Sequence, residues 1–403
     1  MPYPVKWYTH NFTGVHVENS ATPGDFIEII RDCLITGFNA QVPTGITYDS
    51  NADECTATFG SAHGYLQWQI VTIGGANEAA FNGEVRVLRQ TATTITWIPE
   101  TTPPATATTG SAFSALTSPV GGWTIVEEDV PGYRMVLGRT NPNATPYYIV
   151  IKNDTDYCDV PGQYNQWTAG MDIVWQHQYT DIDNHYVARS ERIPAGWRNA
   201  SNSNWSLLAD DLMFYWNHRH ATNSRISTYC YGDINTLIPG DTGHFTISSH
   251  QISASDSRWN NSGWRSHSMF GYSGSAGSWA RYLMTDWSQK EGIINCYLLG
   301  FGSSAMSDEL TYPNAADGGY YYANSPCMIV EGSTASAGTL RGFYPGLVQP
   351  LMRFDGLHQV IVDNCPNFDG ALIFNTLTMH ENENNATQYM IGFRLDNWRQ
   401  SIG

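Results

Sequence analysis

Short alternating runs of β-branched and aromatic residues are the feature that most restricts how this chain of 403 residues can fold. From residue 42 onward, such runs place apolar side chains at every second position, which is typical of strands with one buried face. The clearest runs are 66–73, 84–88, 93–98, 123–126, 134–137, 147–152, 172–175, 212–216, 244–247, 293–299, 327–330, 359–362 and 371–374. We therefore predict a mainly β protein.

One segment near the start has helical periodicity instead. Residues 22–38 contain Thr22 as a candidate cap, a Pro at the first turn and Gly37 as a stop, which predicts a short amphipathic helix over 25–36. Its apolar face consists of Phe26, Ile29, Ile30, Cys33 and Leu34. An apolar face must pack on something, so these five residues are either core or candidates for an interface with another subunit.

A change in composition divides the chain. Residues 101–122, TTPPATATTGSAFSALTSPVGG, have no charged side chain and no periodicity, and we predict a linker or exposed loop there. The expected organisation is an N-terminal arm and helix over 1–41, a small β domain over 42–100, this linker, and one or more larger β domains with long loops over 123–403. Because loops rather than helices separate the later strands, the larger region is predicted to be an antiparallel sandwich or barrel.

The charge balance argues against a nucleic-acid partner, and the distribution of apolar residues argues against a membrane span. Lys and Arg number 20 against 37 Asp and Glu, which gives a net charge of −17 and no basic surface for the phosphates of nucleic acid. No stretch reaches the length of apolar sequence that a membrane span needs, and the first residues lack the pattern of a signal peptide. We expect no nucleic-acid partner, no membrane span and synthesis in a cytosol.

The seven cysteines predict neither a zinc site nor a disulfide framework. They lie tens of residues apart, their number is odd, and no CxxC pair occurs among them. The seven residues are Cys33, Cys55, Cys158, Cys230, Cys296, Cys327 and Cys365. We interpret them as thiols of a reducing compartment, mostly buried as small apolar side chains.

The sequence contains no complete catalytic motif. The segment GYSGS at 271–275 misses the last position of a nucleophile elbow, and the HRH segment at 218–220 lacks the further ligands of a metal site. The acidic pairs at 181/183 and 210/211 have the residue type of glycosidase carboxylates, but are also common turn residues. We expect no enzymatic activity, no cofactor and no catalytic or metal-binding residues.

A long spacer at 253–280 combines Ser, Asn and Gly with aromatic residues. The aromatic residues of interest are Trp259, Trp264, Tyr272 and Trp279. Aromatic rings among small polar residues suit stacking on sugar rings, burial in a subunit interface, or plain packing of the loop. All three interpretations remain open, and a host-surface glycan is therefore a candidate partner.

A series of segments, in the order in which they occur along most of the chain, resembles a family of minor virion structural proteins of tailed bacteriophages that infect Gram-negative bacteria. The segments, in order, are YTHNFTGVHVENSATPGDFIEIIRDCLITGFN, TIGGANEAAFNGEVRVL, GWTIVEEDVPGYRMVLGR, YYIVIKNDT, MDIVWQHQYTDID, NASNSNWSLLADDLMFYW, LRGFYPGLVQPL and a closing NWR. The loops at 194–206 and 253–280 are longer than the family pattern, and the segment at 314–327 departs from it.

The resemblance implies a structural part of the virion in the tail, baseplate or neck, assembled in the host cytoplasm, with no catalytic or cofactor residues to carry over. Its partners would be copies of itself, in a multiple of three or six, together with other virion proteins. Two alternatives stay open: a host-recognition protein that binds or cleaves glycan through its aromatic loop, and a capsid decoration protein.

Overall fold

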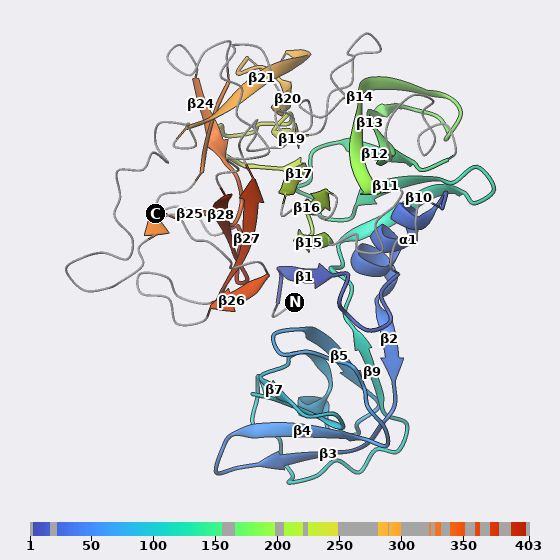
Figure 1. The fold of residues 1–403 in the computed structure, drawn as a ribbon, viewed down its shortest axis with the longest axis vertical. Coiled ribbons are helices and arrows are strands. Elements are labelled where there is room, and N and C mark those ends of the chain that lie inside the picture. The colour runs from blue at the N-terminus through green and yellow to red at the C-terminus, as the bar shows by residue number, and fades with distance from the viewer. Residues whose placement is uncertain are drawn as a thin grey trace.

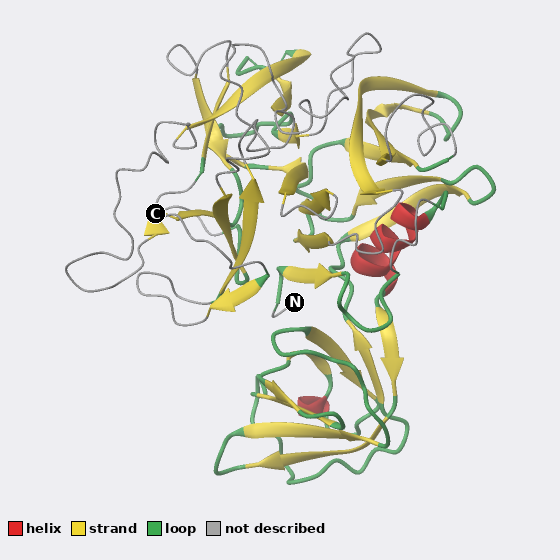
Figure 2. Ribbon diagram, in the orientation of Figure 1, coloured by secondary structure: helices red, strands yellow, loops and turns green. Residues whose placement is uncertain are grey.

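The computed structural model describes residues 3–16, 22–154, 166–197, 205–220, 225–248, 281–288, 290–299, 322–323, 327–331, 339–350, 359–362, 371–378 and 388–399. Within these ranges the fold is mainly β, and neighbouring strands pair antiparallel, as predicted (Figure 2). The described helical segments are α1 (Asp25–Arg31), which continues into a π-helical turn (Asp32–Thr36), and a short 3-10 turn (Ala79–Phe81). In the described part, no helix has the length and apolar character that crossing a membrane requires.

The small domain consists of two four-stranded sheets packed on each other, and it lies at the lower end of Figure 1. One sheet has the order β2 (Phe38–Gln41), β9 (Ser114–Thr117), β5 (Ile70–Gly74) and β6 (Gly83–Arg86). The other has the order β3 (Pro43–Asp49), β4 (Glu54–Phe59), β8 (Thr94–Trp97) and β7 (Arg89–Gln90). Inward side chains of both sheets, among them Val71, Ala57 and Ile95, form a hydrophobic core that belongs to this domain.

Strand β9 lies inside the segment 101–122, where we predicted a linker or exposed loop. Phe113, Ala115 and Thr117 are buried at every second position, and β9 pairs with β5 through Val71 and Ile73. Small Ala, Ser and Thr side chains give little hydrophobic contrast between the two faces, so the alternation is hard to read. The segment therefore returns the chain from the small domain as a buried strand.

The larger body contains one long sheet and two shorter ones. The ten-stranded sheet has the order β1 (Lys6–Thr9), β15 (Trp205–Ala209), β16 (Met213–His220), β17 (Arg225–Asp233), β19 (Phe245–Ser248), β20 (Arg281–Thr285), β21 (Glu291–Leu299), β23 (Met328–Glu331), β24 (Thr339–Phe343) and β18 (Asn235–Thr236). A five-stranded sheet has the order β10 (Trp123–Asp129), β11 (Arg134–Arg139), β12 (Tyr147–Lys152), β13 (Gln166–Tyr179) and β14 (His185–Trp197). The third has the order β22 (Tyr322–Ala323), β25 (Leu347–Pro350), β28 (Gln388–Arg394), β27 (Leu372–Thr378) and β26 (Val360–Val362).

The N-terminal arm belongs to this larger body. Strand β1 pairs with β15, with Trp7 opposite Leu208, and the ring of Phe26 in α1 meets that of Trp216 edge-on at 5.1 Å. These residues share one hydrophobic cluster with the three sheets of the larger body. The chain therefore builds part of this body first, leaves through β2 to form the small domain, and comes back through β9.

The prediction for the helical segment is confirmed at its C-terminal end, and its predicted N-cap residue is wrong. The stop at Gly37 is confirmed, with φ at 72°. At the other end the N-cap position is Gly24, not Thr22, and no side chain of the helix's own segment caps it. Asn153 replaces that cap, since its backbone carbonyl accepts from Gly24 N and its Oδ1 accepts from Phe26 N, both at 3.0 Å. A residue more than a hundred positions away thus satisfies the first turn.

Candidate functional site

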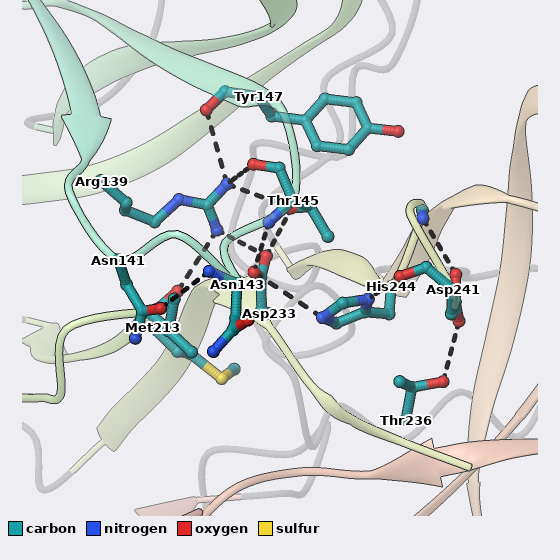
Figure 3. Close-up of polar contacts among 12 residues, drawn as sticks. Arg139, Asn141, Asn143, Thr145, Tyr147, Met213, Asp233, Thr236, Asp241 and His244 are labelled. Atoms are coloured by element: carbon teal, nitrogen blue, oxygen red, sulfur yellow. Dashed lines mark hydrogen bonds and ion pairs between the residues drawn. The ribbon is translucent and has the colours of Figure 1, made fainter. Parts of the chain in front are cut away.

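The ends of β11 and β17 bring a buried ion pair into the interior of the larger body (Figure 3). Arg139 has the same strand parity as Met135 and Leu137, so alternation along β11 turns its side chain toward the core. Its Nη1 lies 2.5 Å from Oδ1 of Asp233, and the two side chains are 2% and 0% exposed. The hydroxyl and the backbone N–H of Thr145 donate to the same carboxylate at 2.6 and 2.8 Å.

The guanidinium of Arg139 has further partners on every side. Nη2 donates to the carbonyl of Thr145 at 2.6 Å and to that of Tyr147 at 3.4 Å, and Nη1 also reaches the carbonyl of Leu212 at 3.4 Å. Its central carbon lies 4.9 Å from the ring centre of Phe245, a cation–π contact. The side chain therefore joins β11 and the start of β12 to the long sheet.

His244 connects this ion pair to a second one. Its Nδ1 lies 2.6 Å from the carbonyl oxygen of Asp241, which can only accept, so Nδ1 carries a proton. Its Nε2 faces Oδ2 of Asp233 at 3.7 Å. One imidazole therefore lies between the carboxylate of Asp233 and the backbone carbonyl of Asp241, whose own carboxylate belongs to the second ion pair (Figure 3).

Arg341, in β24, is the centre of the second cluster and is fully buried. Its Nε and Nη2 bond both oxygens of Asp241 at 2.8 and 2.9 Å, and its Nη1 bonds Glu331 at 2.7 Å. The same guanidinium donates to the backbone carbonyl and the hydroxyl of Thr285 at 3.0 and 2.9 Å. One side chain thus holds β20, β23, β24 and the turn before β19 together.

The end of the described chain is held in the same way. Arg399 donates to both oxygens of Asp210 at 2.6 and 3.1 Å. It also donates to the backbone carbonyl of Asp233 at 2.7 Å and to Oδ1 of Asn235 at 3.1 Å. We call these three connected groups, around Arg139, Arg341 and Arg399, the ionic network.

The electrostatics of the ionic network favour permanent charges. Burial alone would raise the pKa of Asp233, but Arg139 and His244 outweigh it and hold that pKa below its ordinary value. Burial is likewise outweighed at Asp241, where the bonds from Arg341 lower the pKa. A general acid needs a carboxyl whose pKa is raised toward neutrality. These carboxylates therefore suit the joining of strands better than the transfer of protons.

A cavity of about 140 Å³ lies between the start of α1 and the β10–β11 turn. Its acidic lining is already engaged by neighbouring cations: Asp25 by His16, Glu128 by Arg31, and Asp129 by Arg134. The cavity is smaller than the roughly 300 Å³ at which ligand pockets usually begin. We assign no ligand to it.

The structure places the five interface candidates inside the chain itself. Phe26, Ile29, Ile30, Cys33 and Leu34 are at most 1% exposed and belong to the core of the larger body. Of the two interpretations of this helix face, core and subunit interface, the core interpretation describes where these side chains lie. They present no surface to a partner because β10, β15 and β16 supply residues to the same cluster.

Other sequence-level candidates have ordinary partners or lie outside the described residues. Trp259, Trp264, Tyr272 and Trp279 fall outside those ranges, as does the GYSGS segment.

The two acidic pairs have separate partners. Asp210 binds Arg399, Asp211 accepts from Asn141 at 2.7 Å, and Asp183 binds Arg134. Asp181 accepts hydrogen bonds within its own turn, from the backbone N–H groups of 183 and 184.

The described cysteines are free thiols, and all are buried. They are Cys33, Cys55, Cys230, Cys296 and Cys327, while Cys158 and Cys365 fall outside the described ranges. In the described part of the chain, no three His, Cys, Asp or Glu side chains come together in a way that would hold a metal ion.

Sequence reasoning missed the residues of the ionic network, although one signal was present. Arg139 sits at an inward position of a strand-type run, in a chain with only 20 cationic side chains. A rare charge at a core position indicates a buried partner, because an unpaired buried charge is too costly to keep. The partner, Asp233, lies 94 residues away, and no local sequence pattern identifies it as the partner.

Comparisons with known proteins give a single weak structural similarity to report. No family model matches the chain, and no curated protein matches it. Among solved structures, the Phage phi92 endosialidase is similar with a TM-score of 0.17 and 10% identity, over 90% of this chain and 53% of that one. The chain thus spans about half the length of that structure. A TM-score this low does not establish a shared fold, so we draw no functional conclusion from it.

Proposed function

We propose that the protein is a structural component of a tailed-phage virion, and specifically a minor tail, baseplate or neck protein. The observation that carries the proposal is the order of the sequence segments that resemble the phage family along most of the chain. The ionic network commits the buried charges of Arg139, Arg341 and Arg399 to joining strands far apart in the sequence, which assigns them to the fold of the body.

In this proposal the protein works by burying interface area and performs no catalysis. It would form a symmetric ring of copies, in a multiple of three or six, and contact other virion proteins. The net charge of −17 on each copy would keep unassembled subunits soluble and away from the packaged DNA.

The test is the number of copies of this chain in each particle, measured by quantitative mass spectrometry of purified virions and scaled to the portal protein. A small multiple of three, up to about the portal count, is the expected result. Hundreds of copies would instead identify a capsid decoration protein. Absence from the particle would overturn the virion proposal, and binding to a glycan array would then be measured.

A further inference from the structure

The small domain is a separate body joined to the rest of the chain by two crossings. Its core shares no residue with the cluster of the larger body. Strands β2 and β9 run side by side between the two bodies in Figure 1 and pair with each other. Phe38 at the start of β2 and Val120 after β9 already belong to the hydrophobic cluster of the larger body, so the connection to the small domain lies beyond them. Within it, Asn39 has φ at 54°, and the pairing of β2 with β9 is irregular between Phe38 and Gln41. Such a connection allows a hinge unless another contact prevents it.

A buried lysine provides such a contact. Lys6, in β1 of the larger body, is 1% exposed, and its ammonium bonds Oε1 of Glu84 in the small domain at 2.5 Å. The same ammonium donates to the carbonyls of Pro119 at 2.6 Å and Val120 at 3.2 Å, on the returning crossing. All three of its protons therefore have an acceptor. One charge thus connects both bodies and the crossing between them.

The carboxylate of Glu84 in this ion pair is only partly hydrogen-bonded. Oε2 of Glu84 is buried, and the structure gives it no hydrogen-bond partner. Burial is also the main influence on Lys6 and lowers its pKa, although Glu84 acts in the opposite direction. A pair that has lost this much hydration is stable only while both partners stay in place.

Arg86 makes a second connection from the same face of β6. It lies two residues after Glu84, so strand alternation places both side chains on one side, while Val85 points into the small-domain core. Its Nη2 donates to the carbonyl of Leu395 at 2.9 Å, and its guanidinium lies 4.9 Å from the ring centre of Tyr3. Strand β6 therefore presents Glu84 to the N-terminal strand β1, and Arg86 to both Tyr3 and Leu395.

We propose that Glu84 and Arg86 form a latch that holds the small domain at one angle, and that the small domain changes its angle to the larger body when the latch is released. The latch is a conformational device of this chain and does not depend on the proposed role in a virion. It predicts that the small domain has one orientation in the intact protein and several once either contact is removed.

The test measures the distance between the two bodies in the full chain. Spin labels are introduced as unnatural amino acids, which avoids the seven native cysteines, at Asn51 in the small domain and at Asn143 in the larger body. Both positions are exposed. Pulsed electron paramagnetic resonance of the otherwise unchanged protein should give one narrow distance distribution.

Two variants, Glu84→Ala and Arg86→Ala, each remove one contact of the latch. Either should broaden the distribution and add a second population of distances, while thermal unfolding shows that both bodies remain folded. Arg89→Ala is the matched control, because it breaks an exposed ion pair with Glu54 within the small domain and should leave the distribution unchanged. A narrow distribution that persists in both folded latch variants would overturn the proposal, as would a broad one in the unaltered protein.

Discussion

At the scale of single residues, this protein uses few charges, and those in its interior join strands. Only 14% of the residues are charged, yet Arg341, Asp241 and Glu331 meet where 0–6% of each side chain is exposed. Replacing a buried pair by apolar groups is often tolerated, whereas removing one partner leaves an uncompensated charge. The value of each network residue therefore depends on all of its partners.

Arg341→Met should be strongly destabilising, because it leaves the buried carboxylates of Asp241 and Glu331 without their cation. We expect a loss of about 3–5 kcal/mol in the free energy of unfolding, measured with urea. Arg89→Ala serves as the comparison, since Arg89 is 61% exposed and its ion pair should contribute about 0–1 kcal/mol. Similar losses in the two variants would contradict the structural role of the network.

His16 makes stability depend on pH near neutrality. The bond between its Nε2 and Oδ1 of Asp25, at 2.8 Å, is the main cause of its raised pKa, and the charges of Asp25, Asp32 and Glu28 add to it against the effect of burial. A raised pKa in the folded state means that the stabilisation is complete below the unfolded value of about 6.5 and is lost as the pH rises through the folded value.

The stability difference between the unaltered protein and His16→Gln should therefore be largest below about pH 6.5 and should shrink as the pH rises above it. Urea unfolding of both proteins across this window measures the difference directly. An unchanging gap would show that the charge of His16 does not contribute.

At the scale of elements, the distance to which two backbone segments can approach each other decides which of them can pack together. Gly37 ends the π-helical turn that continues α1 and precedes β2, and a Cβ added there would lie 2.4 Å from the carbonyl oxygen of Thr117 in β9. The π-helical turn before it brings Cys33 and Leu34 close enough to accept hydrogen bonds from Val120 and Gly121. Helix end, outgoing strand and returning segment are therefore packed as one unit.

Gly37→Ala should cost more than Gly240→Ala, although both glycines have φ at 72°. The strain of positive φ alone, about 1–2 kcal/mol, applies at both positions. Gly240 has open space around the added Cβ, whereas Gly37 adds the clash with Thr117. Thermal unfolding of the two variants measures the difference, and equal shifts in Tm would contradict the close approach.

At the scale of the whole molecule, the N-terminal segment supports the larger body. Strand β1 forms an edge of the ten-stranded sheet, and Trp7, Phe12, Phe26 and Ile30 belong to its core. A segment that served only to dock on a partner would be removable without loss of the fold. Here the removal of residues 1–41 takes away β1, β2, α1 and part of the core together.

Deletion of residues 1–41 should therefore abolish the fixed packing of the larger body. Near-ultraviolet circular dichroism should lose the signals of packed aromatic rings, since Trp216 loses its contact with Phe26. A truncated chain with native dichroism and cooperative unfolding would contradict this expectation. It would return the helix face to the role of a docking surface.

The sequence by itself determined the fold class, the helical segment that stops at Gly37, and the positions of 13 of the 28 described strands, because periods of 2.0 and 3.6 residues are written locally in side-chain polarity. Only the tertiary structure decided that the apolar helix face is covered by the chain's own strands. It alone revealed the cap by Asn153 and the pairing of Arg139 with Asp233. Burial and ionic partners depend on segments about a hundred residues apart, and no local pattern records which of them will meet.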